Sequence, residues 1–242
     1  MREGCVMQKV RCEWGLGGVE LLRGQAAVMV IVDVLSFSTA VDVATHRQAR
    51  VHPFPWGDDA AARDEAARLG VRLVSGRRAG GQLSLSPASL MKLNPGERLL
   101  LPSPNGSRLS LACGEAVVIA GCLRNAGAVA AKALELAQGG DIAVIPGGER
   151  WADGSLRPAI EDLIGAGAII EALGLEGEPE AAMARDAFRA ARPNLKAVLF
   201  GCRSGIELCE RGYERDVEIA AELDVSRCAP VLTNGAYEDA AT

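Results

Sequence analysis

The sequence predicts an α/β fold in which a sheet carries helices on both faces. Short apolar runs rich in β-branched residues alternate along the chain with longer, Ala-rich segments. Runs of the first kind are typical of fully buried strands, and helical spacing in the longer segments is typical of the helices that cover them. Alternation of the two favours a sheet covered on both faces.

Six short runs are predicted as buried strands, namely residues 27–32, 71–74, 98–101, 116–119, 142–145 and 197–200. The first run is bounded by Gly24 and Asp33. Residues 51–54 form a weaker candidate, and Pro53 suggests that this strand lies at an edge, because proline has no backbone N–H to donate.

Five segments are predicted as helices, namely residues 59–69, 125–138, 158–173, 180–191 and 216–223. Gly70, Gly139 and Gly174 follow the first three, as is usual at helix C-termini. The segment from Pro158 begins with proline and carries acids in its first turn, which favours a helix start. Residues 174–179 are predicted to be the loosest region.

Length and composition limit the architecture and the partners. The chain has 242 residues, of which 49% are apolar, so we expect one domain over residues 1–242 with a substantial core. The formal net charge of −5 argues against nucleic acid, which is bound through clustered Lys and Arg. Aromatic residues make up only 4%, which argues against base stacking. A few local cations could still bind a small anion.

The cysteines indicate a reducing compartment. Seven cysteines are scattered through the chain without a C-x-x-C pair, so neither a disulfide framework nor a zinc site is predicted. The first residues lack an apolar signal core, and no apolar run approaches the roughly 20 residues that span a bilayer. We therefore expect a cytoplasmic protein without a membrane segment.

Asp33 and the hydroxyls after it form the first candidate site. Ligands of open α/β sheets bind beyond the carboxyl ends of the strands. Asp33 comes directly after the first predicted strand, and Ser36, Ser38 and Thr39 lie where a helix would begin. Hydroxyls and free backbone N–H groups suit a phosphate, and the carboxylate suits a hard cation such as Mg²⁺. The alternative is that these side chains only cap the helix.

The loop after residues 98–101 also carries oxygen ligands. Ser103 and Ser107 offer hydroxyls, Asn105 offers an amide, and Gly106 lets the backbone approach a ligand. The alternative is an ordinary Asn-Gly turn.

Arginines follow two of the predicted strands. Arg77 and Arg78 lie in a glycine loop, and their guanidinium groups match phosphate or sulfonate oxygens. Arg124 is either a phosphate clamp or a surface charge, whereas Asn125 is by default a helix cap.

Acidic residues complete the set of candidates. After residues 142–145, a glycine pair stands beside Glu149, Arg150 and Asp153. Glu161 and Asp162 lie near the start of a predicted helix, where they either ligate a metal or complement the helix dipole. The recurrence of oxygen ligands and arginines at the ends of five predicted strands indicates a shared site.

Several other mechanisms lack their motifs. The chain has no G-x-x-x-x-G-K-[ST] loop and no G-x-S-x-G elbow. His46 and His52, the only histidines, do not have metal-type spacing, and without a histidine at the site a Ser-His-Asp triad would be hard to assemble.

Six phrases, in this order along the chain, resemble the 2-phosphosulfolactate phosphatase (ComB-like) family. They are Asp33-Val34-Leu35-Ser36-Phe37-Ser38-Thr39, Gly76-Arg77-Arg78, Leu85-Ser86-Pro87, Ser103-Pro104-Asn105-Gly106-Ser107, Cys122-Leu123-Arg124-Asn125 and Ala159-Ile160-Glu161-Asp162. Residues 201–230 look similar to the family as well. No single motif is decisive, but the resemblance covers nearly the whole chain.

The resemblance implies a three-layer α/β/α domain with a mixed, largely parallel sheet. It also implies Mg²⁺-dependent hydrolysis of a phosphate monoester of a small acid, either 2-phosphosulfolactate or a related phosphorylated hydroxy acid. On this reading Asp33, with Glu161 or Asp162, is catalytic and holds Mg²⁺. The substrate-binding residues would be Ser36, Ser38, Thr39, Ser103, Asn105, Gly106, Ser107 and Asn125 for the phosphate, and Arg77, Arg78 or Arg124 for the second acidic group.

The chain departs from the family pattern at three positions. Ser36 stands where the pattern has arginine, Arg77 where it has glutamate, and Cys122 where it has serine. These departures leave two alternatives open. One is a phosphatase for another small phosphorylated acid, and the other is a non-catalytic small-acid-binding protein in which Glu149, Arg150 and Asp153 are binding groups. A homodimer is the base-rate expectation.

Overall fold

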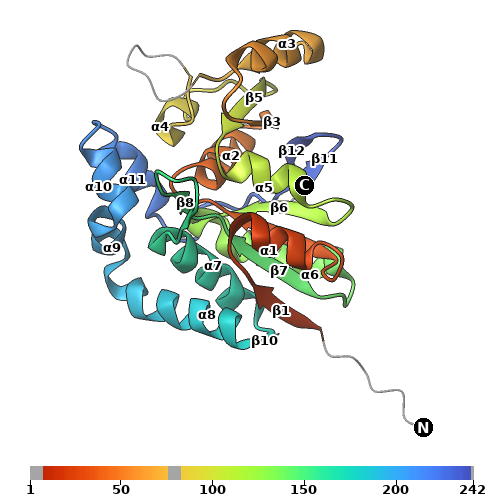
Figure 1. Cartoon of the computed structure of the whole chain (residues 1–242), viewed down its shortest axis with the longest axis vertical. Coiled ribbons are helices and arrows are strands. Elements are labelled where there is room, and N and C mark those ends of the chain that lie inside the picture. The colour runs from red at the N-terminus through yellow and green to blue at the C-terminus, as the bar shows by residue number, and fades with distance from the viewer. Residues whose placement is uncertain (1–7, 76–82, 241–242) are drawn as a thin grey trace.

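One large sheet organises the protein. The computed structural model describes residues 8–75 and 83–240, and within them ten strands join in a single sheet (Figure 1). In spatial order the strands are β10 (Glu176–Gly177), β1 (Lys9–Cys12), β7 (Ile142–Pro146), β2 (Val28–Val32), β6 (Val117–Gly121), β11 (Pro230–Thr233), β12 (Ala236–Asp239), β3 (Arg50–Pro55), β5 (Arg98–Ser103) and β4 (Arg72–Leu73). A separate hairpin pairs β8 (Glu149–Arg150) with β9 (Leu156–Arg157).

The sheet consists of two parallel blocks joined by an antiparallel hairpin. Strands β10, β1, β7, β2 and β6 are mutually parallel, as are β3, β5 and β4. The hairpin β11–β12 pairs with β6 on one side and with β3 on the other, antiparallel in both cases. The predicted mixed, largely parallel sheet is therefore confirmed.

The edge position predicted for residues 51–54 is wrong, because β3 lies between β12 and β5. Its only pairing with β12 joins Tyr237 to Val51. Pro53 lies two residues further along, so the N–H that proline lacks is not needed there.

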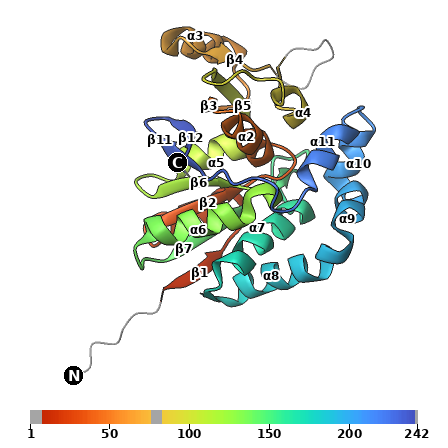
Figure 2. The ribbon, with the colours of Figure 1, turned by 180° about the vertical axis from the view of Figure 1, so that it is seen from behind.

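Helices cover both faces of the sheet. The α-helices are α1 (Gly15–Leu22), α2 (Phe37–His46), α3 (Asp59–Leu69), α4 (Pro87–Leu90), α5 (Gly106–Ala112), α6 (Ala126–Ala137), α7 (Ile160–Leu173), α8 (Pro179–Ala191), α9 (Leu195–Gly201), α10 (Arg203–Cys209) and α11 (Glu214–Ala220), with short 3₁₀ turns at Leu123–Asn125 and Arg192–Asn194. The helix α1 faces the viewer in Figure 1, whereas α6 does so from behind in Figure 2. None of the described helices combines the length and the apolar character that a membrane span requires.

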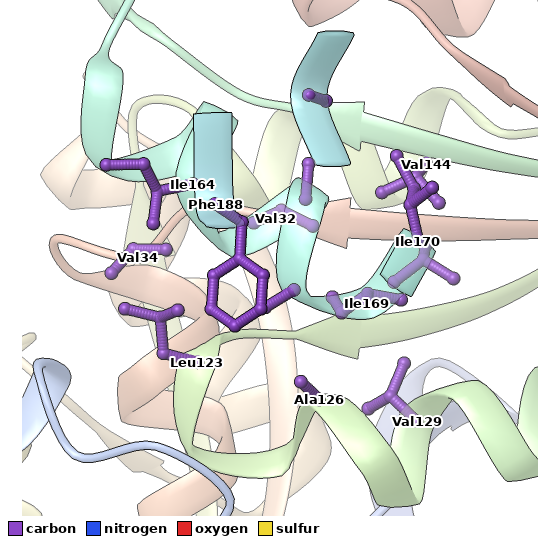
Figure 3. Packing of buried hydrophobic residues seen from close by; sticks show 14 of the residues in the cluster. Val32, Val34, Leu123, Ala126, Val129, Val144, Ile164, Ile169, Ile170 and Phe188 are labelled. Atoms are coloured by element: carbon purple, nitrogen blue, oxygen red, sulfur yellow. The ribbon is translucent and has the colours of Figure 1, made fainter. Parts of the chain in front are cut away.

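Alternating side chains of β2 pack in two separate cores. Val28, Val30 and Val32 pack in one cluster with the buried faces of α6, α7 and α8, part of which Figure 3 shows. Met29 and Ile31 point to the other side, where α1, α2 and α5 pack. Because successive side chains of a strand point to opposite faces, one uniformly apolar strand can serve both layers. This arrangement confirms the three-layer α/β/α fold.

The helices α2 and α5 bring the two blocks of the sheet together. Helix α5 contacts both β2 and β3, and α2 contacts both β3 and β6. Both views show these two helices between the β3–β5 pair and β6 (Figures 1 and 2). Consequently the loop after β5 meets the loop after β2, although the two strands belong to different blocks.

Most predicted elements occur close to their expected bounds. Helix α3 matches the prediction at both ends, with the Asp58 side chain accepting from the backbone N–H of Ala60 and Ala61, and with Gly70 at a φ of 62°. Residues 197–200, predicted as a strand, are wrong because they lie in α9. Leu195 and Leu199 are its buried residues, and their spacing of four is helical.

Candidate active site

Asp33 joins the loop after β2 to the loop after β5. Its carboxylate is buried, and one oxygen accepts from the backbone N–H of Phe37 at 3.2 Å, within its own helix start. The other oxygen accepts from the N–H of Gly106 at 2.9 Å. A Cβ on Gly106 would lie 2.1 Å from Cδ1 of Phe37, so only glycine permits this approach. The Asn-Gly turn is thus part of the Asp33 site.

Asp162 makes a similar link from the first turn of α7. Its Oδ1 accepts from the N–H of Val34 at 2.7 Å, and its Oδ2 accepts from the N–H of Gly148 at 2.8 Å. Gly148 has a φ of 68°, a conformation that glycine adopts without strain. Asp33 and Asp162 therefore hold together the loops after β2, β5 and β7 and the start of α7.

Glu149 and Glu161 add two more acids to this cluster. The pKa of Glu149 is raised from 4.5 to about 7, first by burial and then by the charges of Asp33 and Glu161. Burial likewise raises the pKa of Asp162, with the charges of Asp33 and Glu161 as further causes. Because these shifts come from mutual repulsion as well as from burial, the four carboxyl groups form one electrostatic cluster.

The acidic cluster provides a small set of oxygen ligands for a metal ion. Among the described residues, no three His, Cys, Asp or Glu side chains are arranged to hold one ion. Mg²⁺ needs fewer protein ligands than that, since it usually keeps several waters and binds through one or two carboxylates and substrate phosphate oxygens. Two of the clustered carboxylates are therefore a chemically adequate set for Mg²⁺.

The predicted hydroxyls fall into two groups. Ser38 donates to the carbonyl of Ile31, Thr39 to that of Val34, and Ser107 to that of Leu101, at 2.8–2.9 Å. Each hydroxyl has one proton, so these three have already donated theirs to the backbone. The buried hydroxyls of Ser36 and Ser103, in contrast, have no hydrogen-bond partner among the described residues.

Arg124 and Asn125 make local contacts. Arg124 forms a 2.8 Å ion pair with buried Asp42 and a second, close one with Glu222. Asn125 accepts from the N–H of Cys122 at 2.8 Å and donates to the carbonyl of Ala120 at 3.3 Å, as a cap does. Their predicted roles toward the phosphate or a second acid stay predictions, and Arg77 and Arg78 lie outside the described residues.

The structure also adds residues that the sequence did not assign to the catalytic set. Glu149 accepts from the amide of Asn105 at 3.0 Å, and its signal in the sequence was the glycine pair at the end of β7. Arg157, buried beside Glu149, pairs with Glu207 at 3.2 Å, and it had no signal of its own. Arg150 donates to the carbonyl of Gly154.

A comparison of the sequence with protein-family models gave a match. A family model described as 2-phosphosulpholactate phosphatase matches residues 19–235, which include all four clustered acids. A comparison with curated proteins gave no match.

Proposed function

The chain belongs to the 2-phosphosulpholactate phosphatase family, and we propose that it hydrolyses the phosphate monoester of a small hydroxy acid with Mg²⁺ as cofactor. The observation that carries the proposal is the convergence of Asp33, Glu149, Glu161 and Asp162 at the ends of β2 and β7, beside the loop after β5. Acids that raise one another's pKa in a buried site are typical of functional centres.

Asp33, with Glu161 or Asp162, would hold the Mg²⁺ ion. Both oxygens of Asp33 and of Asp162 already accept backbone N–H groups, which fixes their orientation, and carboxylate oxygens have further lone pairs for a cation. When bound, the ion neutralises phosphate charge and activates water. The repulsion among the four acids supports a cation here, since a positive charge would relieve it.

Ser36 and Ser103 are the best placed hydroxyls to donate to phosphate oxygens. Burying a hydroxyl without a partner costs free energy, and a phosphate oxygen would supply the missing acceptor. Burial is the first cause that raises the pKa of Glu149 and so favours its protonated form, and this carboxyl would give the proton on Oε1 to the departing oxygen of the substrate. Its other oxygen is held by Asn105.

The substrate in this proposal is 2-phosphosulfolactate or a related phosphorylated hydroxy acid. Arg124 is engaged by Asp42 and Glu222, so a second acid group needs another cation. We further propose a cytoplasmic location and a homodimer. The six described cysteines are all free, which is consistent with a reducing compartment.

Replacing Asp33 tests the proposal. The Asp33→Asn variant should lose phosphate release from 2-phosphosulfolactate and from 2-phospholactate in Mg²⁺, and EDTA should have the same effect on the wild type. Asp64→Asn, at an exposed position of α3, serves as the matched control. Melting curves establish that both variants are folded.

Full activity of folded Asp33→Asn would refute the assignment. Thermal stabilisation of the wild type by these esters without any phosphate release would instead indicate a non-catalytic binding protein.

A further inference from the structure

A cavity of about 310 Å³ lies next to the acidic cluster and has no place in the mechanism so far. It is bounded by the start of α1, by the loop leading into α5 and by the β8–β9 hairpin. In Figure 1, α1 and α5 both lie to the right of the strand labelled β8. Ligand sites are concave, mostly apolar and fitted with a few convergent polar groups, and volumes near 300 Å³ are sufficient.

The cavity opens directly onto the proposed reaction centre. Asn105 and Glu149, which are hydrogen-bonded to each other, both line it. Gly147 lines the cavity and lies close to Asp33. A Cβ at Gly147 would lie 3.4 Å from Cδ1 of Leu109, which also lines the cavity, and 3.6 Å from Cβ of Asp33. A phosphate held near Asp33 would therefore place the rest of its ester in this cavity.

The wall is largely apolar. Trp14, Leu16, Leu109 and Leu156 line the cavity, and Leu156 is 41% exposed. Leu156 also closes one side, since a Cβ on Gly15 would lie 3.3 Å from its Cδ1. An exposed leucine in the mouth of a cavity gains by contact with an apolar group. A substrate made only of acid groups would leave this wall without a partner.

Two arginines supply the polar groups. Arg108 of α5 and Arg150 of β8 both line the cavity, and neither forms an ion pair within residues 8–75 and 83–240. Guanidinium groups bind carboxylates through paired N–H donors. Their position beside an apolar wall suits a ligand that combines one carboxylate with an apolar side group.

We propose that this cavity binds the acid part of the substrate, and that the substrate is a phosphorylated 2-hydroxy acid with an apolar side chain. The carboxylate contacts Arg108 or Arg150, and the side chain packs on Leu16, Leu109 and Leu156. This inference rests on the proposed phosphatase activity. Such an ester should be a better substrate than 2-phosphosulfolactate, whose sulfonate would face the apolar wall.

The test compares kcat/KM for three esters, namely 2-phospho-3-phenyllactate, 2-phospholactate and 2-phosphosulfolactate. We expect the phenyl ester to be preferred over each of the others by about tenfold or more. Leu156→Asp should lower kcat/KM for 2-phospho-3-phenyllactate by a larger factor than kcat/KM for 2-phospholactate, so that the preference is lost. Leu21→Asp is the matched control, since Leu21 belongs to α1, is 55% exposed and does not line the cavity.

Arg108→Gln and Arg150→Gln test the carboxylate contact. At least one should lower kcat/KM for 2-phospho-3-phenyllactate by a factor about tenfold or more larger than its effect on phenyl phosphate, which has no carboxylate. Preference for 2-phosphosulfolactate, or equal effects of Leu156→Asp on all esters, would overturn the proposal. So would failure of both arginine variants to discriminate.

A wild type that hydrolyses none of the esters would refute the phosphatase activity but would still allow the cavity to be tested. The readout would then be the thermal shift caused by 3-phenyllactate and by lactate, in the wild type and in Leu156→Asp. A larger shift with 3-phenyllactate that Leu156→Asp abolishes would support the cavity assignment. Equal shifts with both acids, or no shift, would overturn it.

Discussion

Replacing Glu149 by glutamine should stabilise the protein above neutral pH and weaken its catalysis. Burial and the neighbouring charge of Asp33 raise the pKa of Glu149 from 4.5 to about 7. The folded protein therefore binds this proton more tightly than the unfolded chain, so stability falls as the pH rises from 4.5 to 7. At about 1.36 kcal/mol per pKa unit, the cost above pH 7 is about 3 kcal/mol.

Glutamine avoids this cost because it is neutral at every pH, and its carbonyl can still accept from Asn105. The free energy of unfolding of Glu149→Gln should equal that of the wild type near pH 4.5 and exceed it by about 3 kcal/mol at pH 8. For a chain of this length, that difference corresponds to about 6–12 °C in the melting temperature. Phosphatase turnover should fall by about 100-fold or more, because the proton donor is lost.

The measurement is urea denaturation of both proteins between pH 4.5 and 8, in EDTA so that no cation offsets the acidic charge. Glu20→Gln, at an exposed position of α1, is the control and should show no pH-dependent gain. Equal stability of Glu149→Gln and the wild type at pH 8, or an equal gain at both ends of the pH range, would refute the electrostatic reasoning.

Three further substitutions test the contacts that support the site. Gly106→Ala should destabilise the fold by at least about 1–3 kcal/mol in urea denaturation, because the new Cβ would meet the ring of Phe37 at 2.1 Å, and an unchanged midpoint would contradict the close approach. Ser38→Ala should lower the free energy of unfolding by about 1–3 kcal/mol, since the hydroxyl donates to the carbonyl of Ile31 and accepts from the N–H of Asp33. Ser38→Thr should retain part of this stability. Equal losses for the two variants would argue against the hydrogen bonds. Phe188→Ala should cost about 3–5 kcal/mol by leaving a cavity between α7 and α8, and a loss below 1 kcal/mol would show that the helices close over it.

The local elements of the fold could be predicted because their signals are local. The β2 strand and helix α3 are defined by a continuous apolar run and by a capped, glycine-terminated segment. The β11–β12 hairpin has an equally local signal in Asn234-Gly235, both at positive φ. Residues 197–200 differ from the predicted strand because a four-residue apolar run is compatible with either a strand or a buried helix face.

The candidate site was predictable as a list of loops but not as a set of contacts. Asp33, Glu161, Asp162 and the Asn105-Gly106 turn are close together, as their positions after strands and at a helix start suggested. Which hydroxyls remain unpaired depends on backbone carbonyls that are brought near by packing. For that reason Ser38 could not be distinguished from Ser36 before the structure was known.

The sequence by itself determined the alternation of strands and helices, the acids that end β2 and begin α7, and the family to which the chain belongs. These features depend on residue type and spacing along the chain. Only the tertiary structure decided that β3 and β5 join the sheet through the β11–β12 hairpin and that Glu149 shares one buried site with Asp33. Burial and charge repulsion act through space, so the raised pKa of Glu149 exists only once packing has brought the loops after β2, β5 and β7 together.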